Sequence, residues 1–213
     1  MAVTGSEGWP IWLAYWSATL VMAVMCAALV YWISFHALIG FWRRLGARLT
    51  YGLVLVFAIA AVVLVMLYRD DLLAVHYGLH LPLAVAGVLV WSFNFWFWMA
   101  QRGELDYKTM LGLPEVSPRD HDRPLLVDGI YRRMRHPRYA SAMLTVLAFA
   151  LLTNYLAMWI LVVMTVAGFW LVAVLEEREL HRRYGTAYAR YCAVVPRFLP
   201  RMGNPRPDVV VDE

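Results

Sequence analysis

The sequence predicts an all-α polytopic membrane protein: five transmembrane helices with a C-terminal helical hairpin and a cytosolic amphipathic helix. Of the 213 residues, 62% are hydrophobic and only 16% are charged, whereas soluble domains contain about 45–50% apolar and about 25% charged residues. Several uncharged runs reach the roughly 20 residues that a helix needs to cross a bilayer. The basic residues gather in alternate connections between these runs, as expected of cytosolic loops.

Three uncharged runs in the N-terminal half each predict one transmembrane helix. The first helix lies inside residues 9–39, before a cluster of arginines. The second run covers residues 49–68 and ends at Arg69. The third lies within residues 72–101, with Pro82 near the start of its helix, where the missing N–H costs least.

The C-terminal half contains one longer uncharged stretch, residues 139–175, which exceeds the length of a single membrane-spanning helix. A polar turn at residues 153–155 divides it, so we expect a hairpin of two helices, the first rather short. After residue 175, an apolar and aromatic stripe at helical spacing predicts an amphipathic helix. Its members are Leu180, Tyr184, Tyr188 and Tyr191.

The distribution of basic residues tests the number of helices and fixes the expected orientation. Three basic residues lie within 43–48, eight within 102–138 and seven within 178–206, whereas Arg69 stands alone. Five helices place the first three segments on one side of the membrane, and four or six would not. We therefore expect the N-terminus outside and the C-terminus in the cytosol, in the inner (plasma) membrane if the protein is bacterial.

The chain divides into three predicted parts. Residues 1–101 form three N-terminal transmembrane helices. Residues 102–203 contain a cytosolic loop, the helical hairpin and the amphipathic helix, and they form the functional region. The loop is proline-rich but also carries aromatic and aliphatic side chains, so we expect an ordered, functional loop or a re-entrant piece rather than a helix. Residues 204–213 form a flexible polar tail.

Three polar groups are expected at the cytosolic ends of the hairpin. Residues 129–139 precede its first helix, Glu176-Glu177 leave its second helix, and residues 188–200 follow. A hairpin brings the first two groups together, and carboxylates near a bilayer are costly unless they are paired or hydrated. Arg135 and His136 are the expected partners. Taken singly, each group also fits a simpler interpretation as a topological anchor, a solvated helix end or a packing face.

In their order and spacing, the three groups resemble a superfamily of integral membrane methyltransferases, the isoprenylcysteine carboxyl methyltransferases and phospholipid methyltransferases. That pattern reads Gly-x-Tyr-Arg-x-x-Arg-His-Pro-x-Tyr, an apolar hairpin, Glu-Glu-x-x-Leu, aromatic-Gly-x-x-Tyr-x-x-Tyr and Val-Pro-Arg-Phe-hydrophobic-Pro. Ser141 departs from it, because many members carry glycine there. The matching residues are Gly129, Tyr131, Arg132, Arg135, His136, Pro137, Tyr139, Glu176, Glu177, Leu180, Tyr184, Gly185, Tyr188, Tyr191, Val195, Pro196, Arg197, Phe198 and Pro200.

The resemblance implies an S-adenosyl-L-methionine-dependent methyltransferase whose lipophilic acceptor enters from the bilayer. It implies a cofactor site made by Leu126, Val127, Gly129, Tyr131, His136, Tyr139 and Glu176. Arg135 and Arg197 are the candidates to orient an anionic acceptor. Glu177 is a candidate base if the acceptor is an amine or a thiol, whereas a carboxylate acceptor needs no base.

Two alternatives stay open from the sequence alone. A nicotinamide-dependent membrane reductase shares a related C-terminal architecture, and a non-catalytic lipid-binding protein can retain the same helices. We expect no metal, because His76 and His80 form the only ligand-spaced histidine pair and no carboxylate or thiol accompanies them. We also expect no nucleic-acid partner. The expected partners are the membrane and a lipid or lipophilic small molecule.

Overall fold

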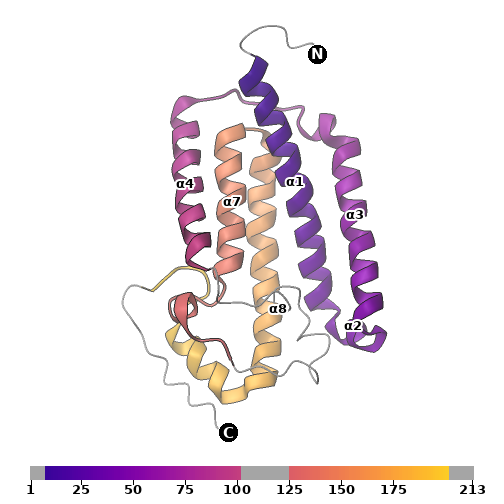
Figure 1. Cartoon of the computed structure of the whole chain (residues 1–213), viewed down its shortest axis with the longest axis vertical. Coiled ribbons are helices and arrows are strands. Elements are labelled where there is room, and N and C mark those ends of the chain that lie inside the picture. Colours follow the sequence, from indigo (N-terminus) through magenta and orange to yellow (C-terminus); the bar gives the residue numbers. More distant parts are fainter. Residues whose placement is uncertain (1–7, 102–124, 202–213) are drawn as a thin grey trace.

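The computed structural model describes residues 8–101 and 125–201, and within these residues the protein is helical without a regular strand (Figure 1). The expected loop at residues 102–138 is described only from residue 125 onward. The expected tail at residues 204–213 lies outside the described residues. The elements are α1 (Gly8–Ala37), α2 (Ile39–Leu45), α3 (Ala47–Leu72), α4 (Leu81–Ala100), the 3-10 helix η1 (Gly129–Arg132), α7 (Pro137–Thr153) and α8 (Leu156–Val194).

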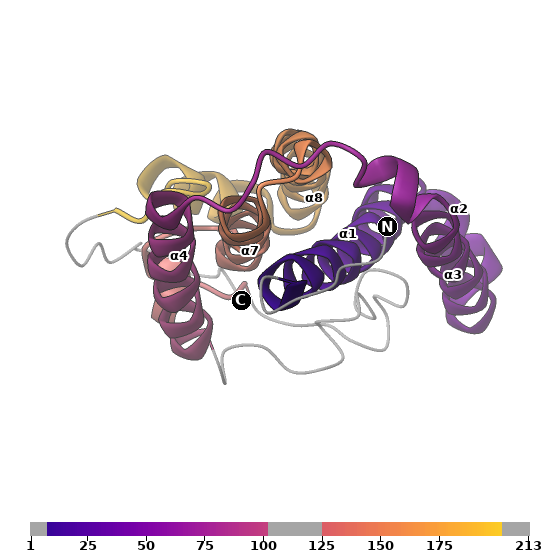
Figure 2. The same cartoon turned by 90° about the horizontal axis from the view of Figure 1, so that it is seen from above.

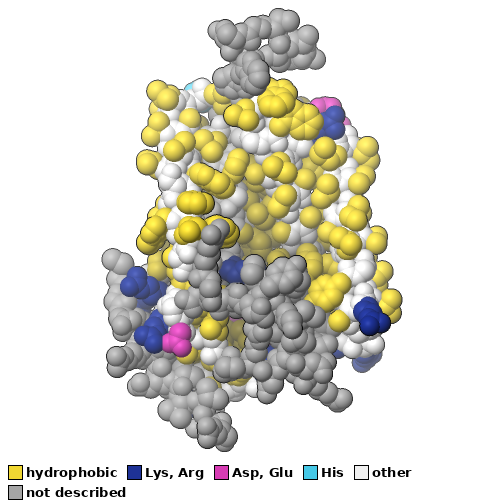
Figure 3. All heavy atoms as spheres, in the orientation of Figure 1, with side chains coloured by type: hydrophobic (Ala, Val, Ile, Leu, Met, Phe, Trp, Pro, Cys, Tyr) yellow, Lys and Arg dark blue, Asp and Glu magenta, His cyan; other side chains and the backbone are white. Residues whose placement is uncertain are grey.

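The helices have the lengths and surfaces of a polytopic membrane protein. Among the described residues, α1, α3, α4 and α8 are long and apolar enough to cross a membrane, and α7 is a shorter apolar helix of 17 residues. At 1.5 Å per residue α7 is about 26 Å long, close to the hydrocarbon thickness. Hydrophobic side chains cover the visible sides of the molecule, while most visible arginines lie toward one end (Figure 3). This agrees with the predicted five spans, the fourth of them short.

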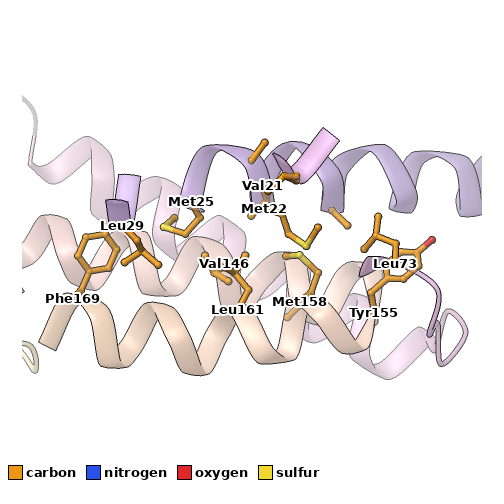
Figure 4. Close-up of a cluster of buried hydrophobic side chains, with 14 of the residues drawn as sticks. Val21, Met22, Met25, Leu29, Leu73, Val146, Tyr155, Met158, Leu161 and Phe169 are labelled. Atoms are coloured by element: carbon orange, nitrogen blue, oxygen red, sulfur yellow. The ribbon is translucent and has the colours of Figure 1, made fainter. Parts of the chain in front are cut away.

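The helices pack around α1, α7 and α8. Seen from above, α3 stands beside α1 at one edge and α4 beside α7 at the other (Figure 2). The buried apolar side chains between α1, α7 and α8 form the main core, which includes Met22, Val146, Met158 and Phe169 (Figure 4). The functional end of the hairpin is therefore held by α1 as well as by its own two helices.

The contact between α4 and α7 is close and partly polar. At Gly87 an added Cβ would come within 2.7 Å of Cγ of Leu152, so only glycine permits this approach. The hydroxyl of Ser141 donates to Oδ1 of Asn94 at 2.8 Å, and Nδ2 of Asn94 donates to Thr145 at 2.9 Å. Ser141, where many members of the resembled superfamily carry glycine, is buried and joins α7 to α4 through its hydroxyl. A glycine at this position could not form that hydrogen bond.

The predicted hairpin turn is confirmed at Asn154. This residue adopts a left-handed conformation with φ 49°, which asparagine tolerates better than most residues. Its side chain donates to the carbonyl of Gly78 at 2.9 Å and accepts from Nε1 of Trp159 at 3.1 Å. The connection before α4 is therefore tied to the turn between α7 and α8.

The boundary of the amphipathic helix differs from the sequence-based expectation. We expected it as a new element after residue 175, but α8 continues through Glu176-Glu177 and changes direction at Gly185, where φ is 53° and ψ is −123°. The reason is that Glu, Arg and Leu all favour the helical conformation. The charged residues after residue 175 therefore end the apolar, membrane-spanning part of α8, but the helix itself continues. Beyond Gly185 the helix turns beneath the bundle (Figure 1).

Candidate functional site

The candidate site lies at the end of the hairpin that is opposite the Asn154 turn. His136 is the N-cap residue of α7, and Pro137 occupies its first position, where proline is favoured. On the neighbouring helix, Glu176 and Glu177 lie within the continuous part of α8. The hairpin therefore brings the histidine and the carboxylates together, as the sequence predicted.

Glu177 lies at the centre of a buried charge cluster. Its carboxylate accepts hydrogen bonds from Nε and Nη2 of Arg197 at 3.0 and 2.7 Å, and its Oε1 lies 2.9 Å from Nε2 of His136. Nε of Arg135 approaches Oε1 at 3.4 Å. Only 8% of the Glu177 side chain is exposed, so these partners compensate for the loss of hydration. The three predicted catalytic residues thus form one group.

Glu176 has a different environment, made of rings rather than arginines. The hydroxyl of Tyr139 donates to its Oε2 at 2.9 Å, and Nδ1 of His136 lies 3.4 Å from the same oxygen. Within the described part of the chain, no arginine forms an ion pair with Glu176. The ring of Tyr139 stacks on Phe169 with 5.0 Å between centroids. The carboxylate therefore adjoins an aromatic surface, and its ion-pair partner among the described residues is the imidazole of His136 and no arginine.

His136 bridges the two carboxylates, and they control its protonation. Burial of the ring lowers its pKa, but the hydrogen bonds to Glu176 and Glu177 outweigh burial and raise the pKa above the ordinary value for histidine. In its protonated form the imidazole donates from both nitrogens. This fixes the side chain between the two helices of the hairpin.

Arg197 reaches the cluster because the chain returns along the motif segment. The backbone N–H groups of Arg135 and His136 donate to the carbonyls of Pro196 and Arg197 at 2.9 and 3.0 Å. The guanidinium of Arg197 also lies 4.7 Å from the ring centroid of Trp170. The backbone pairing that holds this return of the chain has no sequence signal.

The remaining predicted cofactor residues lie on the segment before α7. Val127 packs, together with Leu125, against the buried cluster of Tyr188, Tyr191 and Val195. The carbonyl of Tyr131 accepts a hydrogen bond from the Tyr191 hydroxyl at 2.7 Å.

Gly129 is exposed at the start of η1, and Leu126 is partly buried. The adjacent Leu125, rather than Leu126, joins the apolar cluster.

An open pocket of about 400 Å³ lies nearby, between Arg135 and the returning chain at 192–201. Among the described residues, no group of three His, Cys, Asp or Glu side chains is placed to hold a metal ion.

The sequence-based prediction missed the contribution of α1 to the site and the contact of α2 with α8 beside it. The ring centroid of Trp32 lies 6.2 Å from that of Tyr139, and His36 stacks on Trp32 at 5.6 Å. In α2, Arg43 forms an ion pair with Glu179. A signal was available, because an ionisable residue within an apolar membrane helix indicates a functional site, and His36 is the only histidine of α1.

Comparison with known proteins finds a family match, and it covers part of the residues that form this site. The model of the phospholipid methyltransferase family matches residues 83–187, which include most of α4, the motif before α7, α7 itself and the part of α8 that contains Glu176-Glu177. No curated protein and no solved structure gives a significant match to the chain. Over this segment the chain matches the phospholipid methyltransferase family, which is part of the superfamily of integral membrane methyltransferases that its motifs resemble.

Proposed function

We propose that the protein uses S-adenosyl-L-methionine to methylate a lipophilic acceptor that reaches the site from the bilayer. The observation that carries this proposal is the carboxylate pair at the cytosolic end of the hairpin. Residues of the Arg-His-Pro-x-Tyr motif and of the returning chain hold it together. A structural anchor requires no such convergence of three separate segments.

The residues present fit the chemistry of the cofactor. When bound, S-adenosyl-L-methionine supplies a methyl group on a positively charged sulfonium centre. Glu176, which has no arginine partner among the described residues, adjoins the ring of Tyr139, and carboxylates and aromatic faces both attract cations. Leu126, Val127, Gly129 and Tyr131 would supply backbone groups to the polar parts of the cofactor, with His136 as a further donor.

The charge cluster has a positioning role in the proposed reaction. Methyl transfer is an in-line displacement, so alignment of donor and acceptor and exclusion of water are the main tasks of the protein. We assign Arg135 and Arg197 to the orientation of an anionic acceptor. Glu177 holds Arg197 and His136 in place and, for an amine or thiol acceptor, takes up the proton of the head group.

A cofactor titration tests the proposal against its alternatives. We expect S-adenosyl-L-methionine to raise the Tm of the purified protein in a concentration-dependent way, because ligand binding stabilises by RT ln(1 + [L]/Kd). Transfer of a labelled methyl group is then measured with phosphatidylethanolamine, a long-chain thiol and a prenylated cysteine as acceptors. Stabilisation by a nicotinamide cofactor instead would indicate a reductase, and stabilisation by neither would indicate a non-catalytic protein.

The side chains of the Arg-His-Pro-x-Tyr motif should contribute to cofactor affinity, whereas an arginine that only anchors a helix at the membrane surface should not. His136→Ala removes the bridge between both carboxylates, and Tyr139→Phe removes the hydroxyl bonded to Glu176. We expect each to weaken S-adenosyl-L-methionine binding by about 1–2 kcal/mol, the range of a hydrogen bond to a charged group. Arg44→Ala, at an exposed position of α2, is the control. Equal affinities by calorimetry for all three variants would show that the motif residues are structural only.

The proposed orientation places the site in the cytosol and the Asn154 turn outside. Cysteine at the exposed position Leu81, near the turn, should react with an impermeant maleimide in intact cells. Cysteine at the exposed position Leu199 should react only after permeabilisation. Both reporters require a background in which Cys26 and Cys192 are replaced. The reverse labelling pattern would contradict the orientation.

A further inference from the structure

His36 of α1 is a buried polar side chain without a hydrogen-bond partner in the described part of the chain. Its exposed fraction is 7%, and neither ring nitrogen is paired with another described group. The ring lies against Trp32 and Phe35, with 5.6 Å between centroids in each case. An unpaired buried polar group destabilises the folded protein. The helix therefore positions an imidazole whose partner is not another described residue.

The position of His36 relates it to the carboxylate pair. The charged groups that act on its ring are Glu176, Glu179 and His136, all of which belong to or adjoin the site. Trp32, on which it stacks, contacts Tyr139, whose hydroxyl binds Glu176. Hence α1 forms one wall of the site, whereas Arg135 and Arg197 come from the motif segment and the returning chain.

This wall differs from the cofactor-binding segments in two respects. The residues assigned to the cofactor lie on 126–139 and on α8, so the cofactor already has its polar partners there. In addition, α1 precedes residues 83–187, the part that matches the family, and exposed apolar residues lie near His36 at Val30 and, just after the helix, at Leu38. A lipophilic acceptor that leaves the bilayer at this end of α1 would pass these apolar side chains and find one imidazole among the buried rings of Trp32 and Phe35.

We propose that His36 forms a hydrogen bond with the polar head group of the methyl acceptor. This inference rests on the proposed function. A neutral imidazole has one donor and one acceptor nitrogen, so it pairs with an amine, a thiol or a carboxylate head group. His36 is then a specificity residue that this chain adds from outside the family-matched region.

Two variants separate binding of the acceptor from packing. His36→Phe keeps an aromatic ring against Trp32 but removes both nitrogens, and His36→Gln keeps a donor and an acceptor. Each full-length variant is assayed in lipid nanodiscs with labelled S-adenosyl-L-methionine and whichever of the three acceptor probes the wild type methylates. We expect His36→Phe to lower kcat/KM for the acceptor at least about tenfold, the effect of 1.4 kcal/mol. The Kd of the cofactor should stay within about twofold, and His36→Gln should recover part of the loss.

The stability of the ligand-free protein gives a second readout. Because His36→Phe removes an unpaired polar group, its Tm should equal or exceed that of the wild type. Ser34→Ala, on the same helix, is the control. The proposal is overturned if His36→Phe leaves kcat/KM unchanged, if it weakens the cofactor as much as the acceptor, or if it lowers Tm and His36→Gln restores nothing. A wild type that methylates none of the probes would instead contradict the proposed function itself.

Discussion

Glu177→Gln and Arg197→Ala should each lower turnover on the order of 100-fold, and the double variant should lose less than both effects combined. The two side chains share two hydrogen bonds of 3.0 and 2.7 Å, and the Glu177 side chain is almost fully buried. Removing one member of a buried ion pair leaves the other charge uncompensated, at a cost of about 3–5 kcal/mol when burial is deep. In the double variant this penalty is largely absent.

The same cycle distinguishes a role in the reaction from a role in folding. If Arg197 orients the acceptor, the cofactor Kd of Arg197→Ala should stay within a few-fold of the wild-type value, because the cofactor residues remain in place. Calorimetry measures this affinity, and initial rates give kcat and KM for the acceptor. Interaction energies between contacting residues are typically about 0.5–3 kcal/mol.

A second ion pair in the same protein provides the matched control. Arg43 pairs with Glu179, but the Arg43 side chain is 40% exposed, and surface pairs contribute about 0–1 kcal/mol. Arg43→Ala should therefore change turnover by no more than a few-fold. Additive effects of Glu177→Gln and Arg197→Ala, with both proteins unfolded in detergent, would show that the buried pair is membrane-surface scaffolding.

Much of this arrangement was predictable from the sequence because the membrane imposes simple rules. Apolar length predicted the spans, and the alternation of arginines predicted their number. The polar residues at 153–155 predicted the hairpin turn, which the structure places at Asn154. Once the hairpin is assumed, the meeting of His136 with Glu176 and Glu177 follows from their positions at its two ends.

The features that were not predicted depend on contacts between distant segments. The side of the bundle on which α1 packs is decided by close fits, such as that of Leu29 against Gly168, where an added Cβ would come within 2.7 Å of Leu29 Cδ2. An almost uniformly apolar helix has no periodicity that would indicate this face. For the same reason the pairing of Arg135 with Pro196 through backbone atoms was invisible, since any residue type offers those atoms.

Gly185→Ala should destabilise the protein by about 1–3 kcal/mol and reduce methyl transfer. Gly185 has φ 53° and ψ −123°, a combination that strains every residue with a Cβ, and such strain costs about this much. Space is not the obstacle, because an added Cβ would have no neighbour within 4 Å. The predicted loss therefore comes from the backbone conformation alone.

The bend at Gly185 also determines whether the site can assemble. Immediately after it, Tyr188 and Tyr191 are buried against Val127 and its neighbours, and the Tyr191 hydroxyl binds the carbonyl of Tyr131. If alanine straightened the helix, these contacts and the return of Arg197 toward Glu177 would be lost together. We therefore expect Gly185→Ala to weaken cofactor binding and acceptor turnover in parallel, unlike Arg197→Ala.

Gly52→Ala is the matched control, since its added Cβ also meets nothing within 4 Å but its backbone is helical. Alanine is favoured over glycine in a helix by about 1 kcal/mol, so the Tm of this variant should stay constant or rise. Thermal unfolding and cofactor titration of both variants, in the same detergent, measure the difference. If Gly185→Ala behaved like Gly52→Ala in both measurements, the direction of α8 would be fixed by the packing of Tyr188 and Tyr191, and glycine would not be required at the bend.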